Sequence, residues 1–61
     1  MTTYEMNYKA RLDEMLQKVW RKYGYETEQA LYFATMHEKY YNDANYENRE
    51  TMEKIFKGLM K

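Results

Sequence analysis

Residues 7–25 read NYKARLDEMLQKVWRKYGY, and this stretch decides the fold class. Its large apolar side chains recur with the 3.6-residue period of one face of an α-helix. Basic residues fill the last turn and Gly24 follows them, as is typical of a helix C-terminus. We therefore predict a helix over about residues 7–23, closed by a left-handed Gly24 with Tyr25 packed over Trp20. The predicted apolar stripe consists of Tyr8, Leu12, Met15, Leu16, Val19, Trp20 and Tyr23.

The following segment predicts a second helix over about residues 27–42. Thr27 stands where an N-cap residue is expected, and Glu28 places a negative charge in the positive first turn. Small alanines on the apolar face indicate the close approach of another helix. That face comprises Ala30, Phe33, Ala34, His37 and Tyr41, with Leu31 and Tyr40 at its margins.

The segment Asn42-Asp43-Ala44-Asn45 favours a break, because these side chains compete for backbone hydrogen bonds. We place a third helix over about residues 46–60, capped by Asn45, with Met52, Ile55, Phe56 and Leu59 as its stripe. The alternative is one uninterrupted second helix of about 34 residues, because several apolar positions keep their phase through the segment. The predicted fold class is all-α: a small three-helix bundle, or a helical hairpin with a long second helix that dimerises.

The composition fits one small helical domain spanning residues 1–61. Leu, Ile and Val are scarce, but there are six Met and eight Tyr, and aromatic residues make up 18% of the chain. A net charge of zero and this aromatic content argue against disorder. Because so short a chain builds only a marginal core, we expect help from self-association or from a partner.

The charge distribution and the absence of targeting signals limit the kinds of partner and the cellular location that we expect. Residues 26–53 carry seven acidic and two basic groups, whereas both ends of the chain are basic. The acidic middle speaks against a nucleic-acid surface there, whereas the basic ends leave an opening for one. The chain has no cysteine, no signal peptide pattern near Met1 and no apolar run long enough for a bilayer. We expect a cytoplasmic protein without membrane contact.

Residues suited to catalysis are sparse. His37 is the one histidine, and the positions one turn further on are tyrosines, so we expect a buried or half-buried histidine bonded to a tyrosine or asparagine. The chain has no serine and no cysteine. We therefore predict no enzyme activity, no cofactor and no metal. The carboxylates Asp13, Glu14, Glu47, Glu50 and Glu53 fall on predicted solvent faces, with Glu50–Lys54 and Glu53–Lys57 as expected ion pairs.

Surplus tyrosine and methionine side chains indicate the function. Tyr32 and Met36 lie off the stripe of the second helix, Tyr40 lies at its edge, and Tyr46 opens the third helix. Such side chains are enriched at protein-recognition surfaces, so we predict that these four bind a partner protein.

The predicted function is that of a small regulator, inhibitor or adaptor that acts by protein–protein contact and forms a homodimer or binds another protein. Short, cysteine-free, Tyr/Met/Asn-rich proteins are common among bacteriophage and mobile-element products, including inhibitors of host enzymes. Two alternatives are a helix-turn-helix-like nucleic-acid-binding protein and a self-assembling structural subunit.

Overall fold

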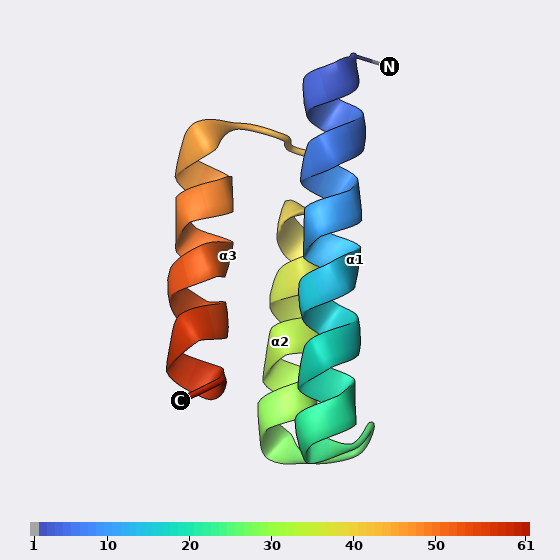
Figure 1. The fold of residues 1–61 in the computed structure, drawn as a ribbon, viewed down its shortest axis with the longest axis vertical. Helices are drawn as coiled ribbons and strands as arrows, with labels where there is room; N and C mark the ends of the chain where they lie inside the picture. Colours follow the sequence, from blue (N-terminus) through green and yellow to red (C-terminus); the bar gives the residue numbers. More distant parts are fainter. Residues whose placement is uncertain (1) are drawn as a thin grey trace.

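The computed structural model describes residues 2–61, which form three α-helices and no strand. α1 spans Thr3–Tyr23, α2 spans Glu28–Tyr40 and α3 spans Tyr46–Leu59. α1 and α3 run in the same direction, and α2 runs in the opposite direction beside them (Figure 1). The three-helix prediction is confirmed. The alternative of one long second helix is wrong, because the chain leaves the helical conformation between α2 and α3.

α1 begins four residues before the predicted start. The Thr2 hydroxyl accepts a hydrogen bond from the Glu5 backbone N–H at 3.1 Å, and the Glu5 carboxylate accepts one from the Thr2 N–H at 3.4 Å. This reciprocal capping box satisfies two donors that the first turn would otherwise leave unpaired. The Thr-x-x-Glu spacing was visible in the sequence and should have set the start of the helix.

Gly24 ends α1, as predicted. Its N–H donates to the carbonyl of Trp20 at 2.8 Å, and the rings of Trp20 and Tyr25 lie 5.0 Å apart, so the expected aromatic contact forms. The conformation differs from the prediction, because φ is 87° but ψ is −178° rather than left-handed helical. The positive φ still favours glycine at this position.

The two loops end in the predicted N-caps. The Thr27 hydroxyl accepts from the Ala30 N–H at 3.3 Å, and the Asn45 side-chain oxygen Oδ1 accepts from the Asn48 N–H at 2.8 Å. The Asn48 side chain also donates to the Asp43 carbonyl at 2.7 Å, which fixes the second loop against the first turn of α3. The break is therefore stabilised by the Asn45 and Asn48 side chains, which satisfy backbone groups that the interrupted helix leaves free.

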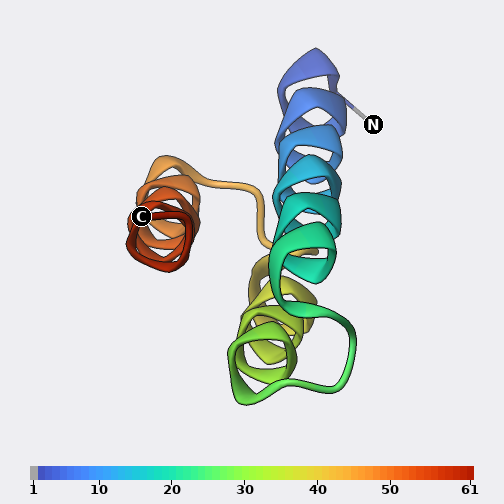
Figure 2. The ribbon, with the colours of Figure 1, turned by 60° about the horizontal axis from the view of Figure 1, so that its bottom comes forward.

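The three helices pack as a triangle around one core, and α1 contributes most of it (Figure 2). The buried side chains all come from the predicted stripes, which confirms the periodicity of each helix. Within residues 2–61 no helix is long and apolar enough to span a bilayer. The buried core consists of Tyr8, Leu12, Met15, Leu16, Val19, Ala30, Phe33, Met52 and Phe56.

The C-terminal ends of α1 and α3 are tied together. The Lys22 ammonium donates to the carbonyls of Leu59 and Lys61 at 3.1 and 2.8 Å, and the Tyr23 hydroxyl also donates to the Leu59 carbonyl. Carbonyls in the last turn of a helix have no partner within the helix, and a cation there also suits the helix dipole. α1 thus supplies the C-terminal cap of its parallel neighbour.

Candidate functional site

The outer side of α2 carries two adjacent exposed apolar side chains. The inner side of the helix is buried through Ala30 and Phe33. Leu31 and Tyr32, on the other side, are 56% and 50% exposed. Burying a side chain of this size contributes roughly 1.5–3 kcal/mol. Because both side chains are about half exposed, the fold leaves part of that contribution unused at two neighbouring positions, and this side of α2 is suited to contact with another molecule.

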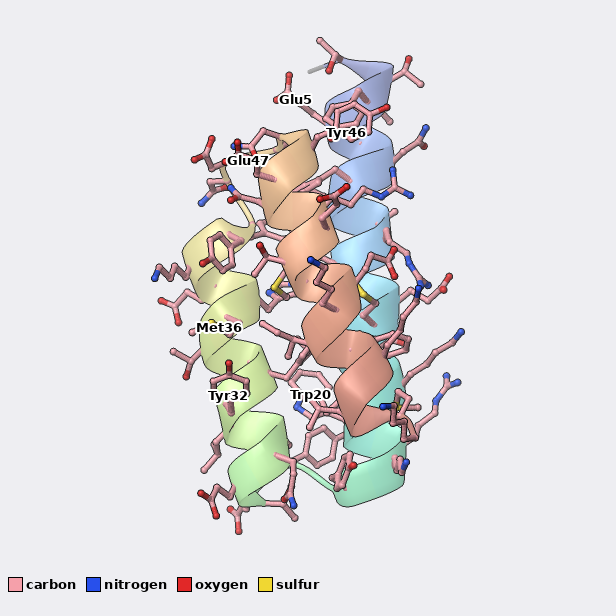
Figure 3. The ribbon with its side chains drawn as sticks, turned by 90° about the vertical axis from the view of Figure 1, so that its left-hand side faces the viewer. Glu5, Trp20, Tyr32, Met36, Tyr46 and Glu47 are labelled. Atoms are coloured by element: carbon pink, nitrogen blue, oxygen red, sulfur yellow. The ribbon has the colours of Figure 1, made fainter. Side chains whose placement is uncertain are left out.

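Three of the four predicted binding residues lie along α2 at intervals of one turn. Tyr32 and Met36 occupy successive turns of the helix (Figure 3). Met36 and Tyr40 are half-buried and pack against the core. The backbone carbonyl of Tyr40 also accepts a hydrogen bond from the Tyr8 hydroxyl at 2.6 Å. Tyr32 is therefore the exposed member of the row, and the other two connect it to the core.

A shallow groove opens beside Tyr32. Glu28, Gln29 and Tyr32 line it from the first turns of α2, and Leu59 lines it from the last turn of α3. Its volume is about 370 Å³. The groove combines an aromatic ring, an aliphatic side chain and a carboxylate.

Tyr46 does not join this row. It lies at the N-terminal end of α3, close to α1 and far along the bundle from Tyr32 (Figure 3). Its ring is 75% exposed and lies 5.9 Å from the ring of Tyr4. The four predicted residues therefore occupy two separate places: the row on α2, and a Tyr4–Tyr46 pair at the opposite end of the molecule.

Sequence reasoning missed two residues of these surfaces. It placed Leu31 at the margin of the apolar face, but the structure exposes its side chain. The helical periodicity predicts this exposure, because Leu31 precedes the buried Phe33 by two residues and is therefore rotated about 200° from it around the helix axis, onto the other side. Tyr4 was also missed, because the start of α1 was placed after it. Its hydroxyl is buried and makes no hydrogen bond.

His37 has a different partner from the one expected. Its Nε2 lies 2.7 Å from Oδ1 of Asp13, and its ring stacks on Tyr41 with centroids 4.8 Å apart. The Tyr41 hydroxyl donates to the other oxygen of Asp13 at 3.4 Å. These contacts link α1 to α2. Residues 2–61 contain no group of three or more acidic, histidine or cysteine side chains that could hold a metal.

Arg11 on α1 and Glu53 on α3 form a bidentate ion pair. The Arg11 Nε and Nη2 atoms donate to the two Glu53 carboxylate oxygens at 2.9 and 2.8 Å, and both side chains are about three-quarters buried. The hydrogen bonds from Arg11 lower the pKa of Glu53. The prediction that Glu53 faces solvent and pairs with Lys57 is wrong, because α1 offers a bidentate partner. In residues 2–61 the expected Glu50–Lys54 pair does not form either.

The basic ends of α1 and α3 converge, as the parallel arrangement requires. Two of the cations are already engaged there. The Lys22 ammonium donates to the carbonyls of Leu59 and Lys61 at the end of α3, and Lys18 pairs with Glu14 at 3.4 Å. These contacts leave fewer free cations for a phosphate backbone than the sequence offers. The C-terminal ends of helices also carry negative partial charge, which disfavours an anion.

Comparisons of the chain with protein-family models, with curated proteins and with solved structures found no match.

Proposed function

We propose that this chain is a non-enzymatic protein-binding module, a small regulator, inhibitor or adaptor that contacts its partner through the outer side of α2. One observation carries the proposal. Leu31 and Tyr32 are exposed side by side, although the opposite side of the same helix completes the core. The fold leaves about half of each side chain exposed, so this apolar surface is available for binding.

The chemistry of the surface supports a protein partner. Tyr and Met are enriched at protein interfaces, because a tyrosine ring offers a large contact area with little loss of side-chain freedom and a thioether adapts to its partner. Tyr32 at the edge of a groove and Met36 one turn along provide this combination. The acidic residues 26–53 favour a partner with basic groups.

A nucleic-acid-binding role receives less support. α2 and α3 run side by side in opposite directions (Figure 1), whereas a helix-turn-helix motif joins two helices that cross steeply. Lys18 and Lys22 are engaged within the chain. The other alternative, a self-assembling structural subunit, would use the same surface of α2, with a second copy of the chain bound there in place of a foreign protein.

Capture experiments with purified variants test the proposal. We expect tagged wild-type chain to retain a partner protein from lysate, and Tyr32→Ala and Leu31→Ala each to weaken that binding at least tenfold, as truncated interface anchors commonly do. Glu50→Ala, an exposed change on α3, is the matched control and should retain the partner.

Tyr46→Ala separates the two predicted places. Loss of the partner with this variant, together with full binding by Tyr32→Ala, would move the binding surface to the Tyr4–Tyr46 end. Equal binding by all four variants would refute the proposal. Circular dichroism of each variant must first show unchanged helix content.

A further inference from the structure

The outer face of α2 is complementary to itself. Glu28, Tyr32, Thr35 and Lys39 follow one another at spacings of four, three and four residues, so they form one stripe along the helix. All four side chains are exposed. The stripe starts with an acidic residue, ends with a basic residue, and has an aromatic ring and a small hydroxyl side chain between them.

An antiparallel copy of the same stripe matches it level by level. When two such helices are related by a twofold axis level with the midpoint between Phe33 and Ala34, Glu28 of one copy lies level with Lys39 of the second copy. Tyr32 then lies level with Thr35 of the second copy, and both matches occur twice because an isologous contact is reciprocal. The exposed Leu31 and the half-buried Met36 flank the stripe and add apolar area on each side.

We propose that the occupant of the outer α2 face in the isolated protein is a second copy of this chain, paired antiparallel through α2. This inference rests on the binding role proposed for that face and names its occupant. The pair hides Leu31 and Tyr32 from solvent, and a foreign partner has to displace the second copy to reach them.

α3 shows why the apolar positions matter. Its outer stripe of Glu47, Glu50, Lys54 and Lys57 has the same order of charges. No exposed large hydrophobic side chain lies within that stripe, because the exposed Tyr46 stands before it and packs against Tyr4. Exposed ion pairs alone contribute little. Of these two helices, α2 is therefore the one whose outer stripe offers both complementary charges and exposed apolar side chains to a second copy.

The pairing should be weak and reversible. A helix of 13 residues is about 20 Å long, so the contact area falls in the range of transient complexes. We expect a dissociation constant of roughly 10 µM to 1 mM, the range of such small contacts. This affinity leaves the face accessible to a partner that binds more tightly.

Charge exchange tests the pairing in purified protein by sedimentation equilibrium. Glu28→Lys and Lys39→Glu each place like charges at both ends of the contact, so each should weaken self-association about tenfold. The double variant Glu28→Lys/Lys39→Glu should restore it. An equimolar mixture of the two single variants should also associate, because each copy then meets opposite charges. Glu50→Lys, on the α3 stripe, should leave self-association unchanged.

Three results would overturn the pairing. They are a wild-type chain that stays monomeric up to about 1 mM, the top of the expected range, a double variant or mixture that fails to recover, and a loss with Glu50→Lys that matches the loss with Glu28→Lys. A dilution series of amide NMR spectra gives an independent reading without variants, and the shifts should concentrate in residues 28–39.

The self-association measurement separates this inference from the proposed function. Self-association without capture of any foreign protein refutes the regulator role and leaves the pairing. Capture that depends on Tyr32, from a chain that never self-associates, refutes the pairing and leaves the regulator role.

Discussion

Tyr4 and Tyr8 lie one turn apart on α1, but only the hydroxyl group of Tyr8 makes a hydrogen bond. The Tyr8 hydroxyl donates to the Tyr40 carbonyl at 2.6 Å, whereas the Tyr4 hydroxyl is buried without a partner. A buried polar group that makes no hydrogen bond costs about 1–3 kcal/mol, while a satisfied one contributes about 1 kcal/mol.

The two tyrosines therefore predict opposite effects of the same substitution. Tyr4→Phe should leave the free energy of unfolding unchanged or raise it by about 1 kcal/mol, and Tyr8→Phe should lower it by about 1 kcal/mol. Urea unfolding of both variants gives the comparison. A loss of stability in Tyr4→Phe would mean that its hydroxyl has a hydrogen-bond partner.

The Arg11–Glu53 pair predicts a pH dependence of stability. The hydrogen bonds from Arg11 lower the pKa of Glu53 in the folded chain. Such a carboxylate stabilises the fold above its unfolded-state pKa, about 4.3 for Glu, and the contribution is lost as pH falls through the folded-state pKa. Glu53→Gln should therefore lower the free energy of unfolding by about 1 kcal/mol at neutral pH and by progressively less below pH of about 4.

Unfolding curves of wild type and Glu53→Gln across this pH range measure the difference. Glu50→Gln is the matched control, because Glu50 is exposed on the same helix and should show no pH-dependent difference. A Glu53→Gln deficit that stays constant down to acid pH would mean that the ion pair does not stabilise the fold.

At the level of helices, the two glycines predict substitutions of opposite sign. Gly24 has a φ of 87°, which strains any other residue, whereas Gly58 lies within α3 and an added Cβ there would have no heavy atom within 4 Å. Gly24→Ala should lower the free energy of unfolding by about 1 kcal/mol or more, and Gly58→Ala should raise it by about 0.5–1 kcal/mol. Thermal unfolding of both variants tests this, and a destabilised Gly58→Ala would indicate that α3 needs the glycine for another contact.

Helix boundaries and buried faces were largely predictable from the sequence, because both depend on neighbours along the chain. Gly24, Thr27 and Asn45 act on backbone groups only a few residues away, so their roles follow from local chemistry. The start of α1 was missed although the Thr2–Glu5 spacing announced it. Every buried side chain belongs to a predicted stripe.

Contacts between helices were not predictable in the same way. Arg11 meets Glu53, and Asp13 meets His37, only because of how each helix is rotated about its axis and which neighbour it faces. A one-residue step turns a side chain by about 100°, so sequence spacing alone leaves the partner open. For the same reason Tyr46 was grouped with Tyr32, although they lie at different ends of the molecule.

For the molecule as a whole, the free energy of unfolding is small enough that truncating a single core side chain removes a large part of it. A domain of 61 residues has a free energy of unfolding of roughly 3–9 kcal/mol. Five of the nine buried side chains come from α1, and α2 and α3 contribute two each. α2 therefore combines a small buried face with an outer face on which Leu31 and Tyr32 are exposed.

Parallel unfolding measurements on Phe33→Ala and Tyr32→Ala test this division most directly, because the two residues are neighbours on α2 and only Phe33 is fully buried. At dilutions where the chain is monomeric, Phe33→Ala should lower the free energy of unfolding by about 3–5 kcal/mol and remove most of the helical circular dichroism signal. Tyr32→Ala should stay within about 0.5 kcal/mol of wild type. A loss in Tyr32→Ala as large as that in Phe33→Ala would show that the outer face holds the fold together and is not free to bind.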